Sequence, residues 1–206
     1  MPAAPEKTET YERLGKLTPL GFAARNGNFS QVQKLLDEGQ EADQRGGDLN
    51  FTVLHLACMI ESGNAPMVEL LLSKGASVAL KDNTGNIPLN IAAEKGDQEI
   101  VKMLLEAGSD INNVNRGGWT PINLAVRHKR GHVAKILIEA GADCNIRNNG
   151  VCAPRGNTPL EIMKSHRAPT GGPIAYLDNI NILALLKART TIEEPETDAT
   201  AATAAA

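Results

Sequence analysis

The chain has 206 residues and a formal net charge of -3, and aromatic residues make up only 3% of it. The negative charge argues against nucleic acid or an anionic membrane as a general partner. The shortage of aromatic residues favours thin helical layers over one large core. Three cysteines without a CxxC pair indicate neither a disulfide framework nor a zinc site.

No apolar run is long enough to span a membrane. The opening sequence MPAAPEKTET has no apolar segment of a secretion signal, so we expect a protein of the cytoplasm, or also of the nucleus. The same composition predicts a disordered tail over 1–10, and the acidic, alanine-rich end predicts another over 190–206.

A Thr-Pro-Leu segment, or a close variant of it, recurs along the rest of the chain. The copies begin at Thr18, Thr52, Ile87, Thr120 and Thr158, with steps of 34, 35, 33 and 38 residues. A period of 33 with small insertions fits these steps and is typical of a repeat protein. Thr followed by Pro favours the start of a helix, because the hydroxyl accepts a hydrogen bond from an unpaired N–H and proline has no N–H to pair.

Each copy predicts two helices, as the third copy shows. Its first helix carries Leu89, Ala92 and Ala93 on a narrow apolar face and should stop near Gly96. Its second helix has apolar residues at helical spacing and should end at Gly108. A polar turn with Asn and Gly follows. Because one such pair cannot bury its apolar faces alone, the pairs must stack.

This pattern resembles the ankyrin-repeat family. The segments DNTGNIPLNIAAEKGD and IVKMLLEAGSDIN follow the family pattern closely, and the resemblance covers about residues 17–186. It implies an all-α fold, a solenoid of about five helix-turn-helix repeats with projecting β-turn or hairpin loops. The expected ankyrin domain spans 11–189, with repeats near 17–50, 51–83, 84–116, 117–148 and 156–188.

Several copies depart from the pattern. Ile87 replaces the capping threonine, at a cost of about 1 kcal/mol. Lys129 stands where glycine is expected, and Gly131 comes two residues later. We expect about five added residues around 149–155, and about ten around 166–173 before a last helix near 176–187.

The resemblance implies that turn tips and the exposed side of the first helices bind partners. Carried over to this sequence, these positions are Arg25, Asn26, Met59, Ile60, Asn83, Thr84, Asn86, Glu94, Lys95, Arg116, Trp119, Arg127, His128 and Lys129.

Trp119 is the most distinctive of these residues, because it is the only tryptophan and falls in a turn. Tryptophan and arginine are enriched at binding hot spots, and we expect Arg116 and Arg127 near it. The alternative is that Trp119 packs across neighbouring turns and stiffens the array. Met59 and Ile60 likewise form either an apolar contact patch or a buried pair that a two-residue insertion has shifted inwards.

The segment from Arg127 to Arg130, with His132, is a compact basic cluster. It could hold an acidic peptide or a phosphate, or it could be a solvated turn between helices. His128 and His132 are four residues apart, but Gly131 interrupts the helix and zinc needs three or four ligands, so no metal is expected. His55, in the second copy, should form a structural hydrogen bond between repeats.

No nucleophile elbow, phosphate-binding glycine loop or Cys–His pair is present, so we expect neither catalysis nor a cofactor. The sequence predicts a monomeric, non-catalytic scaffold that binds another protein through its concave ankyrin surface. One alternative is a regulatory or inhibitory subunit that docks on an enzyme or a transcription factor. A third hypothesis, an enzyme or a small-molecule sensor, would require a closed pocket with converging polar groups.

Overall fold

A computed structural model describes residues 17–60, 64–149, 156–165 and 182–189. The predicted tails at 1–10 and 190–206 lie outside these residues, as do the insertions at 150–155 and 166–173. Part of the predicted last helix also lies outside them. Its described portion runs to Arg189, two residues further than expected.

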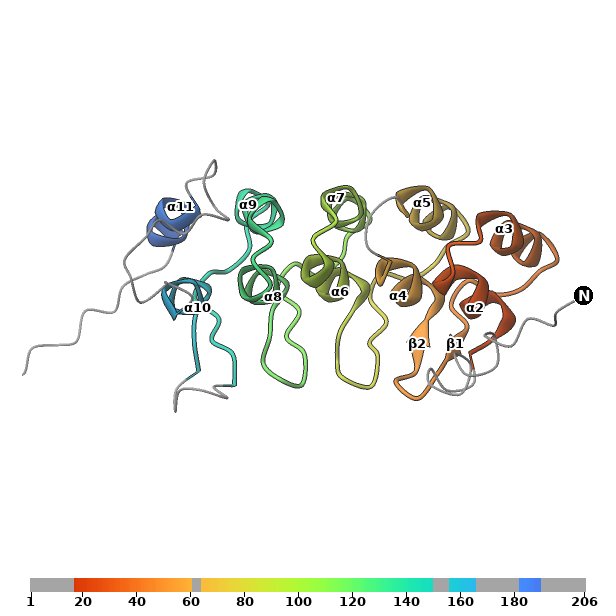
Figure 1. The fold of residues 1–206 in the computed structure, drawn as a ribbon, viewed down its shortest axis with the longest axis horizontal. Helices are drawn as coiled ribbons and strands as arrows, with labels where there is room; N and C mark the ends of the chain where they lie inside the picture. Colours follow the sequence, from red (N-terminus) through yellow and green to blue (C-terminus); the bar gives the residue numbers. More distant parts are fainter. Residues whose placement is uncertain (1–16, 61–63, 150–155, 166–181, 190–206) are drawn as a thin grey trace, which may run out of the picture.

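The described residues form two layers of short helices (Figure 1). Each helix of the first layer packs against the helix that follows it in the second layer, and against its neighbours in its own layer. The first layer comprises α2 (Pro19–Arg25), α4 (Val53–Cys58), α6 (Pro88–Lys95), α8 (Pro121–Arg127) and α10 (Pro159–Ser165). The second comprises α3 (Phe29–Asp37), α5 (Ala65–Ser73), α7 (Gln98–Glu106), α9 (Gly131–Glu139) and α11 (Ile182–Arg189).

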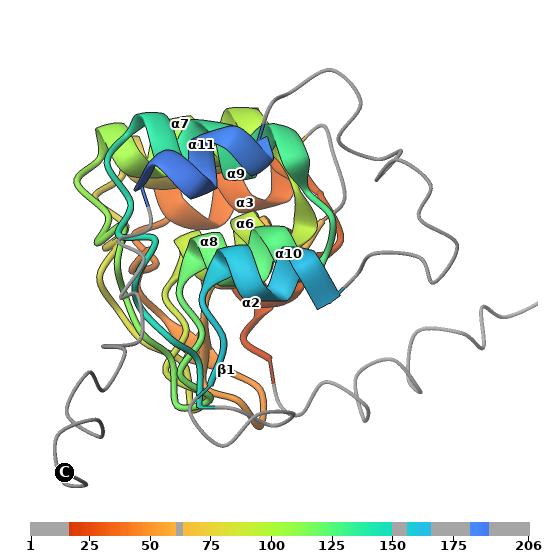
Figure 2. The ribbon, with the colours of Figure 1, turned by 90° about the vertical axis from the view of Figure 1, so that its left-hand side faces the viewer.

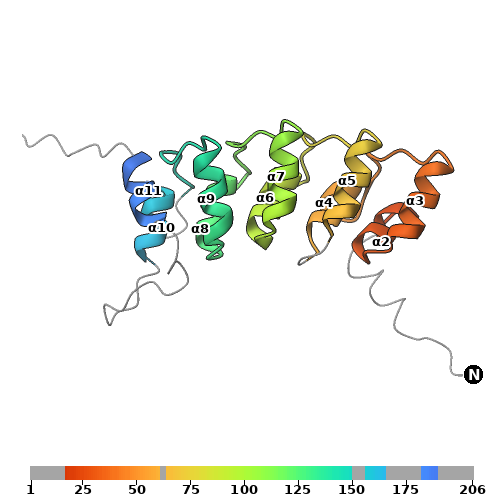
Figure 3. The same ribbon diagram turned by 90° about the horizontal axis from the view of Figure 1, so that it is seen from above.

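Long turns project from one end of the first-layer helices, so that helices and turns together form an L when the array is viewed along its length (Figure 2). From above, the helix pairs stand side by side in a gently curved row (Figure 3). The first turn contains a short antiparallel pair, β1 (Arg45–Gly46) and β2 (Phe51–Thr52). The predicted helix-turn-helix units with projecting turns are therefore present.

Threonine caps start the first-layer helices as the sequence predicts. The Thr18 hydroxyl accepts a hydrogen bond from the Gly21 N–H at 3.1 Å, and Thr120 caps α8 in the same way. Ile87 has no polar group to offer α6. Its own N–H instead donates to the Asn90 side chain at 3.3 Å, which satisfies one backbone group at that helix start.

The core lies between the layers and between successive pairs. Leu89 and Ala92 of α6 have no exposed surface, and neither have Ile100 and Leu104 of α7. The small alanine side chains on the first-layer face leave room for adjacent helices to approach closely. Aliphatic packing between neighbours therefore stabilises the stack.

Backbone hydrogen bonds join the projecting turns to one another. The Asn83 N–H donates to the Leu49 carbonyl at 2.8 Å, and the Arg116 N–H donates to the Thr84 carbonyl at 2.9 Å. Gly85 lies at this second contact with a φ of +80°, and a Cβ there would come within 3.0 Å of the Arg116 nitrogen. Main-chain contacts thus help to hold the turns as one row.

Candidate functional site

Trp119 lies in the turn before α8, half-buried against the core. The backbone N–H of Trp119 donates to the Asn115 side chain at 2.9 Å. The Trp119 carbonyl accepts from the Asn115 backbone N–H and from the Asn90 side chain. The Arg127 guanidinium lies over its ring, 4.6 Å from the centroid. The residue therefore helps to hold its turn in place and also fixes a surface arginine.

Of the two arginines expected near Trp119, Arg127 is the one that the structure brings to it. Arg116 is exposed and lies against Gly85 of the preceding turn, and its carbonyl accepts a hydrogen bond from the Asn149 side chain at 3.1 Å. Arg116 therefore joins neighbouring turns. The arginine at the end of α8 is the one that forms a pair with the aromatic ring.

Arg127, His128 and Lys129 are all exposed at the end of α8. Arg130 behaves differently: its Nε–H donates to the Glu94 carbonyl at 3.0 Å, and its side chain lies across Gly96. A cation at the carbonyl end of a helix is electrostatically favourable. Arg130 therefore ties the end of α6 to the start of α9.

Charged residues from the ends of neighbouring helices affect the pKa of His128. Partial desolvation of its ring lowers the pKa of His128 below its ordinary value; Glu94 opposes this shift, and Arg127, Arg130 and Lys95 reinforce it. Glu94 and Lys95 are half-buried at the end of α6. The ends of α6 and α8 thus form one charged surface. His128 and His132 lie on opposite sides of the helix break, because α8 ends at Arg127 and α9 begins at Gly131.

The predicted contact residues in the third turn are engaged within the array. Asn83 is exposed, and its side chain donates to the Asp48 carbonyl at 3.0 Å. The Thr84 hydroxyl donates to Asp82 at 2.6 Å. The Asn86 N–H also donates to Asp82, a residue that is only 6% exposed. These polar groups shape the turn, and their role in partner binding stays a prediction.

The predicted residues of the first two copies lie at the far end of the row. Arg25 is half-buried, and its Nε has no hydrogen-bond partner among the described residues. Asn26 is exposed at the end of α2. Met59 and Ile60 are both half-buried, and Met59 packs against the core. The apolar pair is therefore neither an open patch nor part of the interior.

His55 forms the predicted hydrogen bond between copies. Its Nδ1 accepts from the Thr52 N–H at 3.2 Å, so Nε2 carries the proton and donates to the Asn86 carbonyl at 3.0 Å. Burial lowers the pKa of His55, although the Asn86 carbonyl and Asp82 oppose the shift. This histidine is a neutral structural donor.

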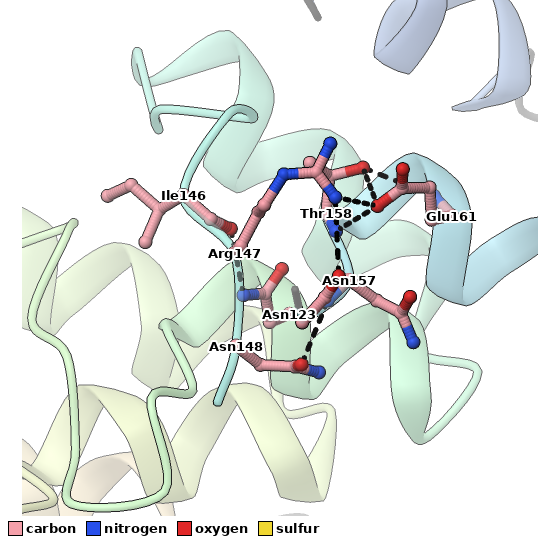
Figure 4. Close-up of polar contacts among 8 residues, drawn as sticks. Asn123, Ile146, Arg147, Asn148, Asn157, Thr158 and Glu161 are labelled. Carbon is pink, nitrogen blue, oxygen red and sulfur yellow. Dashed lines mark hydrogen bonds and ion pairs between the residues drawn. The ribbon is translucent and has the colours of Figure 1, made fainter. Parts of the chain in front are cut away.

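The junction of the fourth and fifth copies has its own polar cluster (Figure 4). Glu161 accepts from the Thr158 N–H and from Arg147, both at 2.8 Å. Burial works against ionisation of Glu161, but these two donors outweigh it and hold the pKa of Glu161 below its ordinary value. In the same cluster, the Asn123 side chain donates to the Ile146 carbonyl at 3.2 Å, while its own oxygen is buried without a partner in the described part of the chain.

Three residues that organise the turns were not predicted as site residues. Asp82, Asn115 and Asn148 are spaced by 33 residues, and each closes its turn by accepting backbone N–H groups. That spacing was visible in the sequence and could have identified them. In the described ranges, no group of three or more His, Cys, Asp or Glu side chains gathers in a way that could hold a metal ion.

A sequence model for ankyrin repeats (three copies) matches residues 20–115 and 59–148, more than half of the chain. The chain belongs to the ankyrin-repeat family. Ankyrin repeats are generally modules for interaction with other proteins, and this agrees with the surface of turns and helix ends described above. None of the helices in the described ranges is both long and apolar enough to cross a bilayer.

Three relatives illustrate how far the similarity extends. The human palmitoyltransferase ZDHHC13 is 42% identical over 73 residues, which is 35% of this chain and 11% of the relative. The mouse protein of that name is 46% identical over 66 residues, 32% of this chain and 10% of the relative. A putative ankyrin repeat protein of fowlpox virus, FPV031, is 37% identical over 76 residues, 37% of this chain and 22% of the relative. The chain thus covers about a tenth of the length of the palmitoyltransferases that it matches.

Proposed function

We propose that this chain is a five-repeat ankyrin solenoid that binds a partner protein, as a monomer and without catalysis. The contact surface is the face made by its turns and by the ends of its first-layer helices. The observation that carries the proposal is the contact of Arg127 with the Trp119 ring beside the charged end of α6. It brings together two residue types that are enriched at binding hot spots, an exposed arginine and a half-buried tryptophan.

The rigidity of the array supports this function. The turns are joined by backbone hydrogen bonds, and the helices pack through fully buried aliphatic side chains. A surface that is already ordered loses little conformational entropy on binding, so it can reach useful affinity without a deep pocket.

A second candidate is a regulatory role on an enzyme. The matching stretch of the human and mouse relatives belongs to proteins named palmitoyltransferases, so a similar ankyrin segment accompanies an enzyme there. The proposed compartment is the cytoplasm or the nucleus, where the buried Cys58 and Cys144 would stay as the free thiols that the structure contains.

A photo-crosslinking amino acid at Lys95 tests the proposal in cells. We expect one stoichiometric protein to crosslink from Lys95, which is at the proposed surface, and not from Lys102, which is exposed on the second-layer helix α7. If the captured protein is an enzyme whose activity changes, the regulatory role is supported. Equal crosslinking from both positions, or none from Lys95, would contradict the proposed surface.

A further inference from the structure

Trp119 holds Arg127 in a defined position on the surface. The guanidinium carbon lies over the ring, 4.6 Å from its centroid, so the cation is attracted to the face of the ring. A guanidinium also carries N–H groups that can form two parallel hydrogen bonds to one carboxylate. Within the ranges that the structure describes, the Arg127 side chain has neither a hydrogen bond nor an ion pair, and the residue is exposed.

The surroundings of Arg127 are positively charged, although the whole chain carries a net charge of -3. Lys95 and Arg130 act on His128 together with Arg127, and Glu94 is the one carboxylate that acts against them there. The ion pairs in the described ranges lie elsewhere: Lys34–Glu38, Lys74–Asp37, Lys135–Glu139 and Arg147–Glu161. This surface thus carries an excess of positive charge.

Stabilisation of helix ends explains only part of this charge. Arg130 donates to the Glu94 carbonyl and so has a structural role. Lys95 lies in the last turn of α6, where a cation is favourable in any case. Arg127 also ends a helix, yet its guanidinium turns to the Trp119 ring instead of bonding a carbonyl. Its position over the ring, exposed and away from any carbonyl partner in the described ranges, is what points to a ligand.

We propose that Arg127, held over the Trp119 ring, is the binding centre for a carboxylate in an acidic segment of the partner protein, with Lys95 of the neighbouring helix adding positive charge to the same surface. This inference rests on the proposed function and names the chemistry of the partner. The contact with the ring restrains the guanidinium before the partner arrives, so less side-chain entropy is lost when the carboxylate binds.

The same surface suits a carboxylate better than it suits a phosphate or a nucleic acid. Both α6 and α8 present their carbonyl ends here, and that end of a helix carries a partial negative charge. A phosphate dianion would meet this charge more strongly than a carboxylate does. Single-stranded nucleic acid also needs several exposed aromatic side chains for stacking, and Trp119 is half-buried.

The full chain, immobilised, can be used to select from a random peptide phage library. Enriched peptides are then synthesised and titrated against the chain, and binding is followed by the fluorescence of Trp119, the only tryptophan. Each peptide is compared with an analogue in which Gln and Asn replace Glu and Asp. Inorganic phosphate and a single-stranded oligonucleotide serve as competing ligands. The variants are Arg127→Gln, Arg127→Lys and the control Lys102→Gln, each checked for its fold by circular dichroism.

We expect the enriched peptides to be acidic and to shift the Trp119 emission. Arg127→Gln should weaken their binding at least about tenfold, because a charge-assisted hydrogen-bonded pair is lost. Arg127→Lys should restore only part of it, and Lys102→Gln should bind as the wild type does. Tighter binding of phosphate or the oligonucleotide, or equal binding of the neutral analogue, would overturn the inference. If neutral peptides bind and depend on Arg127, the proposed function stands and the inference fails; if no peptide is enriched, both fail.

Discussion

Lys129, in the turn after α8, has a backbone conformation that residues other than glycine seldom adopt. Its φ is +60°, while the equivalent positions of the first and third repeats are Gly27 and Gly96, with φ values of +67° and +89°. The sequence places lysine where glycine is expected, and the backbone nonetheless keeps the shape of a glycine turn. A left-handed residue that is not glycine costs about 1 kcal/mol or more.

Replacing this lysine should therefore stabilise the protein. We expect Lys129→Gly to raise the free energy of unfolding by about 1 kcal/mol, because glycine has no Cβ and adopts the left-handed conformation without a steric cost. Urea denaturation followed by circular dichroism measures it. The matched control is Lys102→Gly in the middle of α7, which should lower stability by about 0.5–1 kcal/mol. A loss of stability in Lys129→Gly would contradict this account.

Asn123 lacks the donors that its counterpart Asn90 has. The Asn90 side-chain oxygen accepts from the Asn113 side chain at 2.7 Å and from the Ile87 N–H at 3.3 Å. Asn113 lies 33 residues before Ile146, which cannot donate from its side chain, and the Asn123 oxygen is left buried and unpaired among the described residues. A buried acceptor without a partner costs about 1–3 kcal/mol.

Ile146→Asn should supply this donor and stabilise the chain by about 1 kcal/mol. The reciprocal change, Asn113→Ile, should remove the shorter of the two bonds to the Asn90 oxygen and the bond to the Gly85 carbonyl, and destabilise the chain by about 1–3 kcal/mol. Thermal unfolding of the two variants and the wild type gives both values. If Ile146→Asn lowers the melting temperature, the burial of Ile146 matters more than the missing hydrogen bond.

At the scale of elements, the turns are held by close backbone contact. The bond from the Arg116 N–H to Thr84 requires the two chains to approach at Gly85, where there is no room for a Cβ. Gly39 has a similar positive φ of +91°, but nothing lies within 4 Å of the place where its Cβ would be. Substitutions at Gly85 and Gly39 therefore separate the cost of backbone strain from the cost of losing the contact between turns.

Gly85→Ala should therefore destabilise the protein by about 1 kcal/mol or more beyond Gly39→Ala. Both substitutions force a Cβ into a positive-φ position, and only the first also pushes against the next turn. Chemical denaturation of both variants measures the difference. Equal losses would mean that contact between these turns contributes little to stability.

The second repeat also makes stability depend on pH. Burial holds the pKa of His55 below the value of about 6.5 that it takes in the unfolded chain. The unfolded state therefore binds more protons between these two values, so the contribution of His55 is complete above about pH 6.5 and is lost as the pH falls below it.

We expect the wild type to lose more stability between pH 7.5 and 5.5 than His55→Asn, which has the residue found at the same position in the third and fourth repeats. Urea midpoints at the two pH values give this difference. The lowered pKa of His128 changes stability in the same direction. Because His128 is present in both proteins, it does not contribute to the difference between them. An equal pH dependence of the two proteins would show that His55 is not the group responsible.

The sequence predicted the helices better than the side-chain contacts. The apolar period and the Thr-Pro starts give the helix pairs, because those rules act within one copy. The partner of Arg127 could be predicted because Trp119 is close to it in the chain. The bond from Arg130 to the Glu94 carbonyl and the unpaired Asn123 oxygen join different copies, and their geometry depends on how the copies stack.

Across the whole molecule, packing connects each helix pair with its neighbours. Contacts run from α2 to α4, from α4 to α6, from α6 to α8 and from α8 to α10. In an array of this kind, stability is close to a sum of the units and their interfaces. Damage at the centre should therefore spread in both directions, while damage at an end should stay local.

Leu89→Ala in α6 and Leu20→Ala in α2 test this difference, because both side chains have no exposed surface. Each should create a cavity that costs about 2–5 kcal/mol. Hydrogen exchange should show lost protection on both sides of α6 in the first variant, and mainly in α2 and α3 in the second. The same pattern of loss in both variants would mean that the array unfolds only as a whole.

Asn148 and Asn157 give this scaffold a place where its length can change. The Asn148 N–H donates to the Asn157 carbonyl at 3.1 Å, and the Asn157 N–H donates to the Asn148 side chain at 3.0 Å. Asn115 and Trp119 make the same pair of bonds across a much shorter segment. The closing bonds therefore do not depend on how many residues lie between them. New segments can be gained, lost or grafted at this tip while the next helix keeps its position.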